Sequence, residues 1–442
     1  MVPRSADPSL EFEVVVDGRR GTYRLGASLD ITPESARPVL RPGVPTASGE
    51  ATLEVAARPA QGMVQKLASA PGDSVSFRGR FLYRDRVFGP EGFIHSLSIY
   101  DPLKPIRFAT VELLGDLSII PVATGFTDST GAFSITIMPQ PAATYRVRVL
   151  STTGVDWGGS NLRVRTSSAQ NGAYFSATTP NRNNVTGDVD WGDQVIEPGV
   201  AEGFNLLDCL IEGARQVELL SGSLPSTNVN AYWNSNSTDG TYFNVSSSSI
   251  YLLADEGYDD CVVLHEFGHF VAAHYSKDES PGGEHFIDDD KQDPRLAWSE
   301  GFASYFQASV RKRLGDPYPS WYVDTWGTPG AGQLLFSYNL EGANQVGQGT
   351  SDNRVVFQGI YVRGAGSEVV VQALLWDLED GPDTPGSVGI DDDALELGPQ
   401  PWWSVVTGPL KAAVAVSLED FWDGWLAPVS YTHLTLPTIY SV

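Results

Sequence analysis

Two histidines four positions apart stand in the segment Val263-Leu264-His265-Glu266-Phe267-Gly268-His269-Phe270. On an α-helix, residues four apart share one face, so the imidazoles of His265 and His269 can reach one tetrahedral metal ion. Glu266 projects close to the same face, where a carboxylate can take a proton from a metal-coordinated water molecule. Apolar residues on both sides, over 261–273, predict that this helix is buried. The pattern indicates a catalytic metal site on a core helix.

A zinc site for hydrolysis needs a third protein ligand and an open fourth position. The metzincin extension would place glycine at 272 and histidine at 275, but this chain has Ala272 and Tyr275. A glutamate on a second helix is the other common solution. The downstream segment Ala297-Trp298-Ser299-Glu300-Gly301-Phe302-Ala303 resembles the W-x-E-G-F-A segment of gluzincin peptidases.

The gluzincin resemblance implies a zinc metallopeptidase that cleaves peptide or protein substrates. It implies that His265, His269 and Glu300 bind Zn²⁺, with zinc-bound water as the nucleophile and Glu266 as the general base. Taken without its neighbours, Glu300 is better explained as an acid near a helix N-terminus. The alternative from another class is an inactive, zinc-stabilised surface module for binding or adhesion, which an intact Glu266 disfavours.

Two gluzincin features have no match in this chain. The first leaves the type of cleavage open, and the second leaves the oxyanion donor open. The G-x-M-E-N segment of the aminopeptidases is absent, so neither exopeptidase nor endopeptidase activity follows. The second feature is a downstream histidine, which thermolysin-like enzymes use to stabilise the oxyanion. The only histidine after His285 is His433, in the C-terminal segment that we exclude below, so Tyr361 is the candidate donor to the oxyanion. His274 and His285 are interpreted as surface or loop residues. The acidic run 288–290 is interpreted as a solvated loop, with a Ca²⁺ site as the minority alternative.

Composition excludes some function classes. The chain has 442 residues, of which 41% are hydrophobic, so it can form two or three globular domains. Its 54 acidic and 29 basic residues give a formal charge of −25, which argues against binding to nucleic acid phosphates. No segment is long and apolar enough to span a membrane. The acidic charge suits an extracellular or cell-surface hydrolase.

The first part of the chain predicts β-structure. Residues 1–72 are expected to form short strands, and residues 73–152 a β-sandwich whose segment 104–133 resembles the transthyretin-like or carboxypeptidase-regulatory-like domains. Within it, residues 127–131 are expected to close a hairpin. Residues 153–200 are rich in Gly, Asn, Ser and Asp and are expected to form a connector. In the connector, residues 188–193 suit either turn acids beside a strand or a Ca²⁺ site.

Residues 201–428 are expected to form the zinc metallopeptidase domain. Helical periodicity covers 201–220, 298–314, 369–378 and 418–426, and strands are expected at 229–233 and 249–253. The second strand is expected to hold an extended peptide along its edge. The predicted fold is therefore multidomain, an N-terminal all-β sandwich region followed by an α+β zincin-like (gluzincin) catalytic domain.

Both ends of the chain and both cysteines leave alternatives. The first residues lack the apolar core of a signal peptide, so either the protein is cytoplasmic or the native N-terminus lies upstream. Residues 429–442 back-translate to a sequence resembling a DNA library adapter, and we exclude them as an artefact. Cys209 and Cys261 are compatible with one disulfide or with two separate buried thiols.

Overall fold

The computed structural model describes residues 74–427, except 96–99, 117, 139–142, 155–156, 158–160, 170–171, 239, 284, 288, 290, 327–332, 342–347, 350–364, 383 and 386–394. Before residue 74 it describes only the strands β1 (Leu10–Val16), β2 (Arg19–Leu25), β3 (Ala36–Pro38) and β4 (Val55–Ala57). Tyr361, Asp288, Asp290 and residues 429–442 therefore lie outside the described residues.

Strands β1 to β4 and residues 62–425 belong to two different structural units of the chain. β1 pairs antiparallel with β2, and β3 pairs antiparallel with β4. Short strands were expected in this part of the chain, and these four confirm that expectation.

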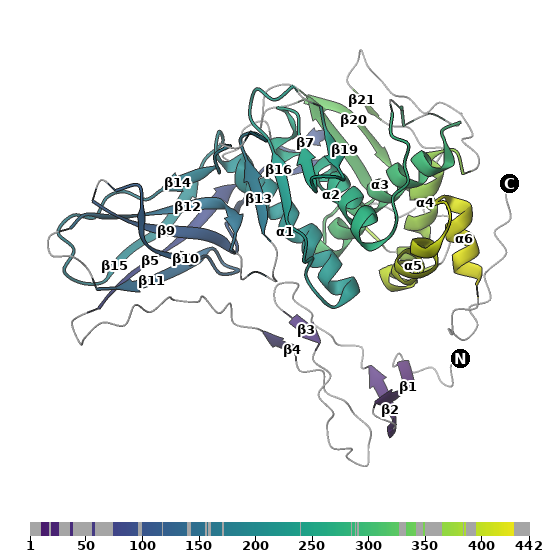
Figure 1. Ribbon diagram of the computed structural model, residues 1–442, viewed down its shortest axis with the longest axis horizontal. Helices are drawn as coiled ribbons and strands as arrows, with labels where there is room; N and C mark the ends of the chain where they lie inside the picture. The colour runs from purple at the N-terminus through teal and green to yellow at the C-terminus, as the bar shows by residue number, and fades with distance from the viewer. Residues whose placement is uncertain are drawn as a thin grey trace. The chain divides into compact units, whose positions relative to one another are not determined.

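Most strands within residues 74–196 belong to two sheets that pack face to face (Figure 1). A short hairpin of β6 (Phe88–Gly89) and β7 (Gly92–Phe93) forms a separate sheet. One has the order β11 (Ala132–Ile137), β5 (Val75–Arg84), β15 (Val189–Ile196), with β8 (Leu103–Pro105) also paired to β5. The other begins β10 (Pro121–Phe126), β9 (Ala109–Gly115), β12 (Tyr145–Thr153), with β14 (Ser176–Thr178) also on β12. Because strand side chains alternate between faces, one face of each sheet is apolar. The rings of Phe77 and Tyr145 meet across the two sheets at 4.9 Å.

The turn at 127–131 does not close a hairpin, so that prediction is wrong. The turn joins β10 to β11, and these strands pair into different sheets. Asp128 Oδ1 accepts hydrogen bonds from the backbone N–H groups of Thr130 and Ala132. Gly131 takes φ +80°, and a Cβ there would lie 2.3 Å from the Phe81 carbonyl oxygen. The turn residues specify a tight reversal but carry no information on which sheet the next strand joins.

The second sheet continues past the predicted connector. From β12 it runs through β13 (Leu162–Arg165), β16 (Val229–Tyr232) and β18 (Ser249–Tyr251) to β17 (Tyr242–Asn244). Residues 153–200 therefore contain three strands, β13, β14 and β15, and are not an irregular linker. The Gly- and Asn-rich composition concealed β13 and β14, whereas a strand at residues 188–193 was one of the two alternatives from sequence. The other domain boundaries stay a prediction.

The remaining described elements are helices and a small sheet. α1 (Ala201–Ser221), α2 (Asp260–Tyr275), α3 (Pro294–Leu314), α4 (Glu368–Glu379) and α6 (Leu418–Leu426) confirm the expected helices. α5 (Pro399–Val405), which runs into a π-helical turn at Val406–Leu410, was not expected. The sheet has the order β19 (Trp321–Trp326), β20 (Gln333–Asn339), β21 (Gln348–Gly349). A strand-rich N-terminal region is thus followed by a mixed region of helices and strands.

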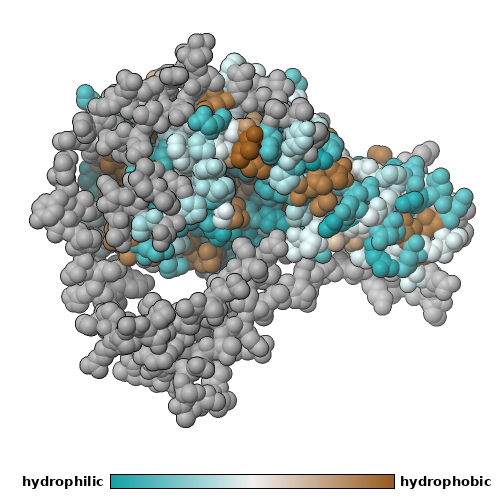
Figure 2. Space-filling model, turned by 180° about the vertical axis from the view of Figure 1, so that it is seen from behind, coloured by the Kyte–Doolittle hydropathy of each residue, from teal (hydrophilic) through white to brown (hydrophobic). Residues whose placement is uncertain are grey.

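The apolar residues of α2 and α3 lie in the protein core. Phe267 and Phe306 are fully buried, and their rings stack at 6.2 Å. Among the described helices, none has the length and apolar character needed to cross a membrane. On the face shown in Figure 2, hydrophilic residues cover most of the described surface and apolar residues form separate patches.

Candidate metal centre

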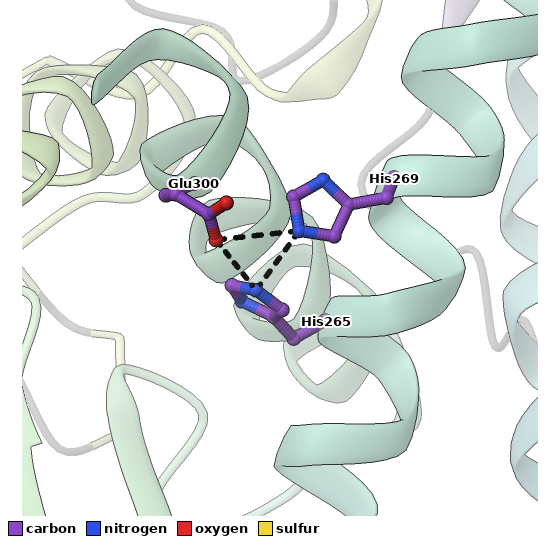
Figure 3. Close-up of side chains that lie close together, drawn as sticks. All are labelled: His265, His269 and Glu300. Carbon is purple, nitrogen blue, oxygen red and sulfur yellow. Dashed lines mark hydrogen bonds and ion pairs between the residues drawn. The ribbon is translucent and has the colours of Figure 1, made fainter. Parts of the chain in front are cut away.

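The segments that carry the sequence motifs form two adjacent helices, α2 and α3. α3 begins at Pro294, a residue suited to the first helical turn, and the Asp293 side chain caps it by accepting a hydrogen bond from Arg295 N. This start places Glu300 in the second turn of α3. His265 and His269 lie one turn apart on α2, and all three side chains point toward one another (Figure 3).

Three donor atoms form a nearly equilateral triangle. His265 Nε2 and His269 Nε2 are 3.2 Å apart, and Glu300 Oε2 lies 3.2 Å from the first and 3.3 Å from the second. Donor atoms on a tetrahedral zinc ion with bonds of about 2.0–2.1 Å lie about 3.3–3.4 Å apart. The residue types and their spacing therefore fit one shared zinc ion.

Two serines of α3 hold the imidazoles in orientation. His265 Nδ1 lies 3.1 Å from Ser304 Oγ, and His269 Nδ1 lies 3.2 Å from Ser299 Oγ. The Ser299 hydroxyl donates to Asp278 Oδ2, so it accepts from the Nδ1–H of His269. That tautomer leaves the lone pair of His269 Nε2 directed at the centre of the triangle. The serines were not predicted, although their positions flank Glu300 on the same helix.

Glu266 lies beside the triangle but is not one of its corners. Its side chain is buried, and Oε2 has no hydrogen-bond partner among the described residues. The carboxylate accepts a hydrogen bond from the backbone N–H of Phe243. Burial raises the pKa of Glu266 above its ordinary value, although His269 and His265 oppose the rise. A raised carboxyl pKa moves the group toward the range in which it exchanges protons near neutral pH.

The strand nearest to Glu266 is β17, which carries Phe243. The sequence pointed instead to the segment around β18 as the exposed edge, and this expectation is wrong. β18 is paired on both sides, with β16 and β17, whereas β17 is the last strand of the path among the described residues. The ring of Phe243 also contacts Phe270 of α2, at 6.2 Å. The sheet edge next to the candidate centre is therefore β17.

The three clustered side chains favour a positive charge between them. Burial alone would lower the pKa of His269, but Glu300, Glu266 and Asp278 together raise it to about 10. Burial alone would raise the pKa of Glu300, but His269, His265 and His285 hold it well below its ordinary value. A divalent ion would supply the same positive charge in place of protons.

His285 and Glu368 also reach this centre, which the sequence did not predict. His285 Nε2 lies 3.6 Å from Glu300 Oε2 and 3.6 Å from Glu368 Oε2. The hydrogen bond to Glu300 raises the pKa of His285 to about 9, against the effect of burial. Burial raises the pKa of Glu368 to about 8, with Glu300 adding to the rise. His285 is a loop residue as expected, but it faces the candidate centre. No signal in the sequence marked Glu368.

The remaining candidate residues lie elsewhere. His274, on α2, hydrogen-bonds to Ser248 Oγ at 2.9 Å and is not part of the triangle. In the segment proposed as a calcium site, Asp188 pairs with Arg78 and Asp193 with Arg80, so their charges are already balanced. Asp289 accepts a hydrogen bond from Phe286 N. Tyr361 is outside the described residues.

The two cysteines are separate buried thiols. Cys209 donates to Asp260 Oδ1 at 3.2 Å, and Cys261 Sγ lies 3.0 Å from Arg311 Nη1. Burial raises the pKa of both thiols, to about 12 for Cys261. Of the two alternatives that the sequence left open, the structure has the unbridged one.

Residues 221–387 match the family model described as the Mycolysin C-terminal domain. The match covers less than half of the chain but includes both motif segments, and it relates this part of the chain to metallopeptidases. A protein of Archaeoglobus fulgidus, described as uncharacterized, is 38% identical over 85 residues, which is 18% of this chain and 25% of that protein. The chain thus aligns with about a quarter of that relative's length.

Proposed function

We propose that the protein is a zinc-dependent peptidase in which His265, His269 and Glu300 hold the metal. The observation that carries the proposal is the triangle of donor atoms with edges of 3.2–3.3 Å. Beside it lies the buried Glu266 carboxylate, one oxygen of which has no hydrogen-bond partner among the described residues. The family match to a metallopeptidase domain supports it. An extracellular location stays a prediction.

Each residue has a distinct part in the proposed chemistry. When bound, zinc acts as a Lewis acid and lowers the pKa of a coordinated water molecule. Glu266 accepts a proton from the attacking water and then donates it to the leaving amine. Its raised pKa suits both transfers, because the group must take up and release a proton at similar pH. Burial of the carboxylate keeps bulk water from competing for that proton.

The substrate is proposed to bind as an extended peptide along β17. An edge strand of a sheet can pair with a peptide main chain through its backbone N–H and C=O groups. Phe243 lies on this strand and donates its N–H to Glu266, so the strand and the proposed base are in direct contact. The scissile carbonyl of a peptide on this edge would be presented to the side of α2 that carries Glu266.

The decisive experiment combines metal analysis with a casein-type assay on wild type and two variants. Glu266→Gln should retain zinc and lose about 10²–10⁴-fold in activity, because it removes the base without removing a ligand. Glu300→Ala should lose zinc and activity together. Glu419→Gln, at an exposed position on α6, serves as the matched control and should behave as wild type.

Two outcomes would contradict the proposal. A zinc-loaded Glu266→Gln variant with full activity would show that another group takes the proton. A wild-type protein that binds zinc but cleaves no peptide would favour the alternative of an inactive, zinc-stabilised binding module.

A further inference from the structure

Three carboxylates converge at the N-terminal end of α2, before its histidines. They belong to Glu256 in the short 3₁₀ helix Glu256–Tyr258, to Asp259 just before α2, and to Asp324 on β19. One oxygen from each lies within 4.8 Å of the others. Glu256 and Asp259 are only 5% and 1% exposed. One short segment, 256–259, and the distant strand β19 thus bring their acids together at a site where two of the three are buried.

No basic side chain balances this group among the described residues. Some other buried acids of the protein form ion pairs: Asp208 and Glu212, for example, both contact Arg107. In contrast, none of the three carboxylates forms an ion pair with a Lys, Arg or His of the described chain. Buried carboxylates without a partner are strongly unfavourable unless they bind a proton or a cation.

Neutral donors satisfy only part of the group. Both oxygens of Asp259 accept hydrogen bonds from Thr325, whose backbone N lies 2.8 Å from Oδ2. Glu256 Oε1 accepts from Thr241 Oγ1 at 3.0 Å. Glu256 Oε2, however, is buried and has no hydrogen-bond partner among the described residues. An unpartnered carboxylate oxygen inside a group of acids is what a cation-binding site requires.

We propose that Glu256, Asp259 and Asp324 bind a calcium ion. All the donors are hard oxygens, which Ca²⁺ prefers, and the group contains no nitrogen or sulfur ligand that would favour zinc. The donor oxygens lie within 4.8 Å of one another, which ligands of one calcium ion with bonds of about 2.4 Å can span. Backbone carbonyls and water would complete its coordination.

The ion would act as a structural link. It joins the 3₁₀ helix, the start of α2 and strand β19, so it fixes the end of the helix that carries His265 and His269. The Asp259 side chain does not cap α2 but is directed to Thr325 of β19. Binding at this point would therefore stabilise the fold without taking part in the chemistry, and it does not depend on the proposed zinc site.

The test uses the full chain, freed of calcium by a calcium-selective chelator and then titrated with CaCl₂ or MgCl₂ near neutral pH. Calorimetric titration should find one calcium ion bound per chain. Saturating calcium should raise the unfolding temperature by about 3–5 °C, the shift expected of a ligand at about 100 times its Kd in a chain of this size. Magnesium should bind more weakly, because it demands tighter octahedral geometry.

Terbium provides a second readout that depends on position. Tyr258 and Trp326 lie in the elements that form the site, so excitation of aromatic residues should sensitise Tb³⁺ luminescence, and calcium should displace it. Glu256→Gln with Asp324→Asn should abolish both signals. Each substitution keeps the side-chain shape and removes a buried charge, so the variant should fold without calcium. Asp423→Asn, an exposed acid on α6, is the control.

Two results would overturn the calcium site. One is a wild-type protein whose unfolding temperature does not change with calcium, which would mean that the three acids are held protonated. The other is an equal calcium response in wild type and in the double variant, which would place the ion elsewhere. Neither result bears on zinc binding, because the histidine triangle is unchanged in these variants.

Discussion

Gly268 of α2 lies so close to Ala303 of α3 that a Cβ on Gly268 would come within 2.8 Å of the Ala303 Cα atom. At this contact the two helix backbones approach with no side chain between them. Gly268 precedes His269, and Ala303 lies one turn after Glu300. The close approach therefore brings the donor atoms of the two helices to within hydrogen-bond distance of one another.

We predict that Gly268→Ala weakens metal retention. The added methyl group must push α2 away from α3, and overpacking of this kind costs about 1–3 kcal/mol. Zinc affinity, measured by competition with a chromophoric chelator, should fall, and the unfolding temperature should fall with it. Gly187→Ala is the matched control, because a Cβ at that position meets nothing within 4 Å. Unchanged zinc affinity in Gly268→Ala would show that the helix separation does not set the geometry of the site.

Ser299→Ala and Ser304→Ala should each lower zinc affinity by about 10–100-fold, the range typical of groups that orient metal-binding histidines. Each variant removes the hydroxyl that fixes one imidazole, yet leaves all three donor residues in place. The measurement is again zinc competition, accompanied by a circular dichroism spectrum to confirm folding. Ser404→Ala on α5 is the control. Equal zinc affinity in all four proteins would contradict a role for these hydroxyls.

The shared helix face of His265 and His269 was predictable because it depends on local periodicity. Residues four apart share a helix face in any helix, and the two motif segments each carry their own helical pattern. Periodicity also gave α4 to within one residue at each end, whereas α3 begins at Pro294, four residues before the predicted start. What sequence added beyond periodicity was the resemblance of the Glu300 segment to a known motif.

The other parts of the site depend on contacts between distant segments, which periodicity does not encode. Glu368 reaches His285 only because α4 packs closely against α3. The contact requires a glycine at position 301 of α3, since a Cβ there would lie 2.5 Å from the Cβ of Val371 on α4. The position of β17 at the sheet edge is likewise a matter of strand order. The carboxylate of Asp324 on β19 lies close to that of Asp259 before α2. No feature of the sequence around either residue predicts that they are neighbours.

The acid cluster also predicts a pH dependence of stability. Burial raises the pKa of Asp259 from 3.8 to about 7, although hydrogen bonds from Thr325 oppose the rise. Burial likewise raises the pKa of Glu256 well above its ordinary value. The folded chain thus holds these protons more tightly than the unfolded chain does. The tighter binding of these protons stabilises the folded chain. This contribution is fully present below pH 3.8, the pKa of Asp259 in the unfolded chain, and is lost as the pH rises through about 7, its pKa in the folded chain.

We therefore expect the calcium-free protein to lose stability between about pH 4 and pH 7, and saturating calcium to reduce that loss. Urea midpoints measured across this range, with chelator and with calcium, provide the test. Asp324→Asn should show a smaller loss in chelator, because one of the mutually repelling acids is gone. Parallel pH curves with and without calcium would contradict this link between the acids and the ion.

The last prediction concerns the group that stabilises the oxyanion. His285 Nε2 lies 3.6 Å from Glu300 Oε2, so an N–H at this nitrogen can reach a substrate atom next to the proposed metal. Tyr361 is the candidate from sequence. We expect His285→Ala to lower kcat by about 10²–10³-fold, the usual effect of removing one oxyanion donor, while KM and zinc content change little. Tyr361→Phe is the matching variant: if it shows the loss of kcat and His285→Ala does not, the tyrosine is the donor. A loss of zinc from His285→Ala would instead make His285 part of the metal-binding set, because a group that acts only on the oxyanion leaves the bound metal unaffected.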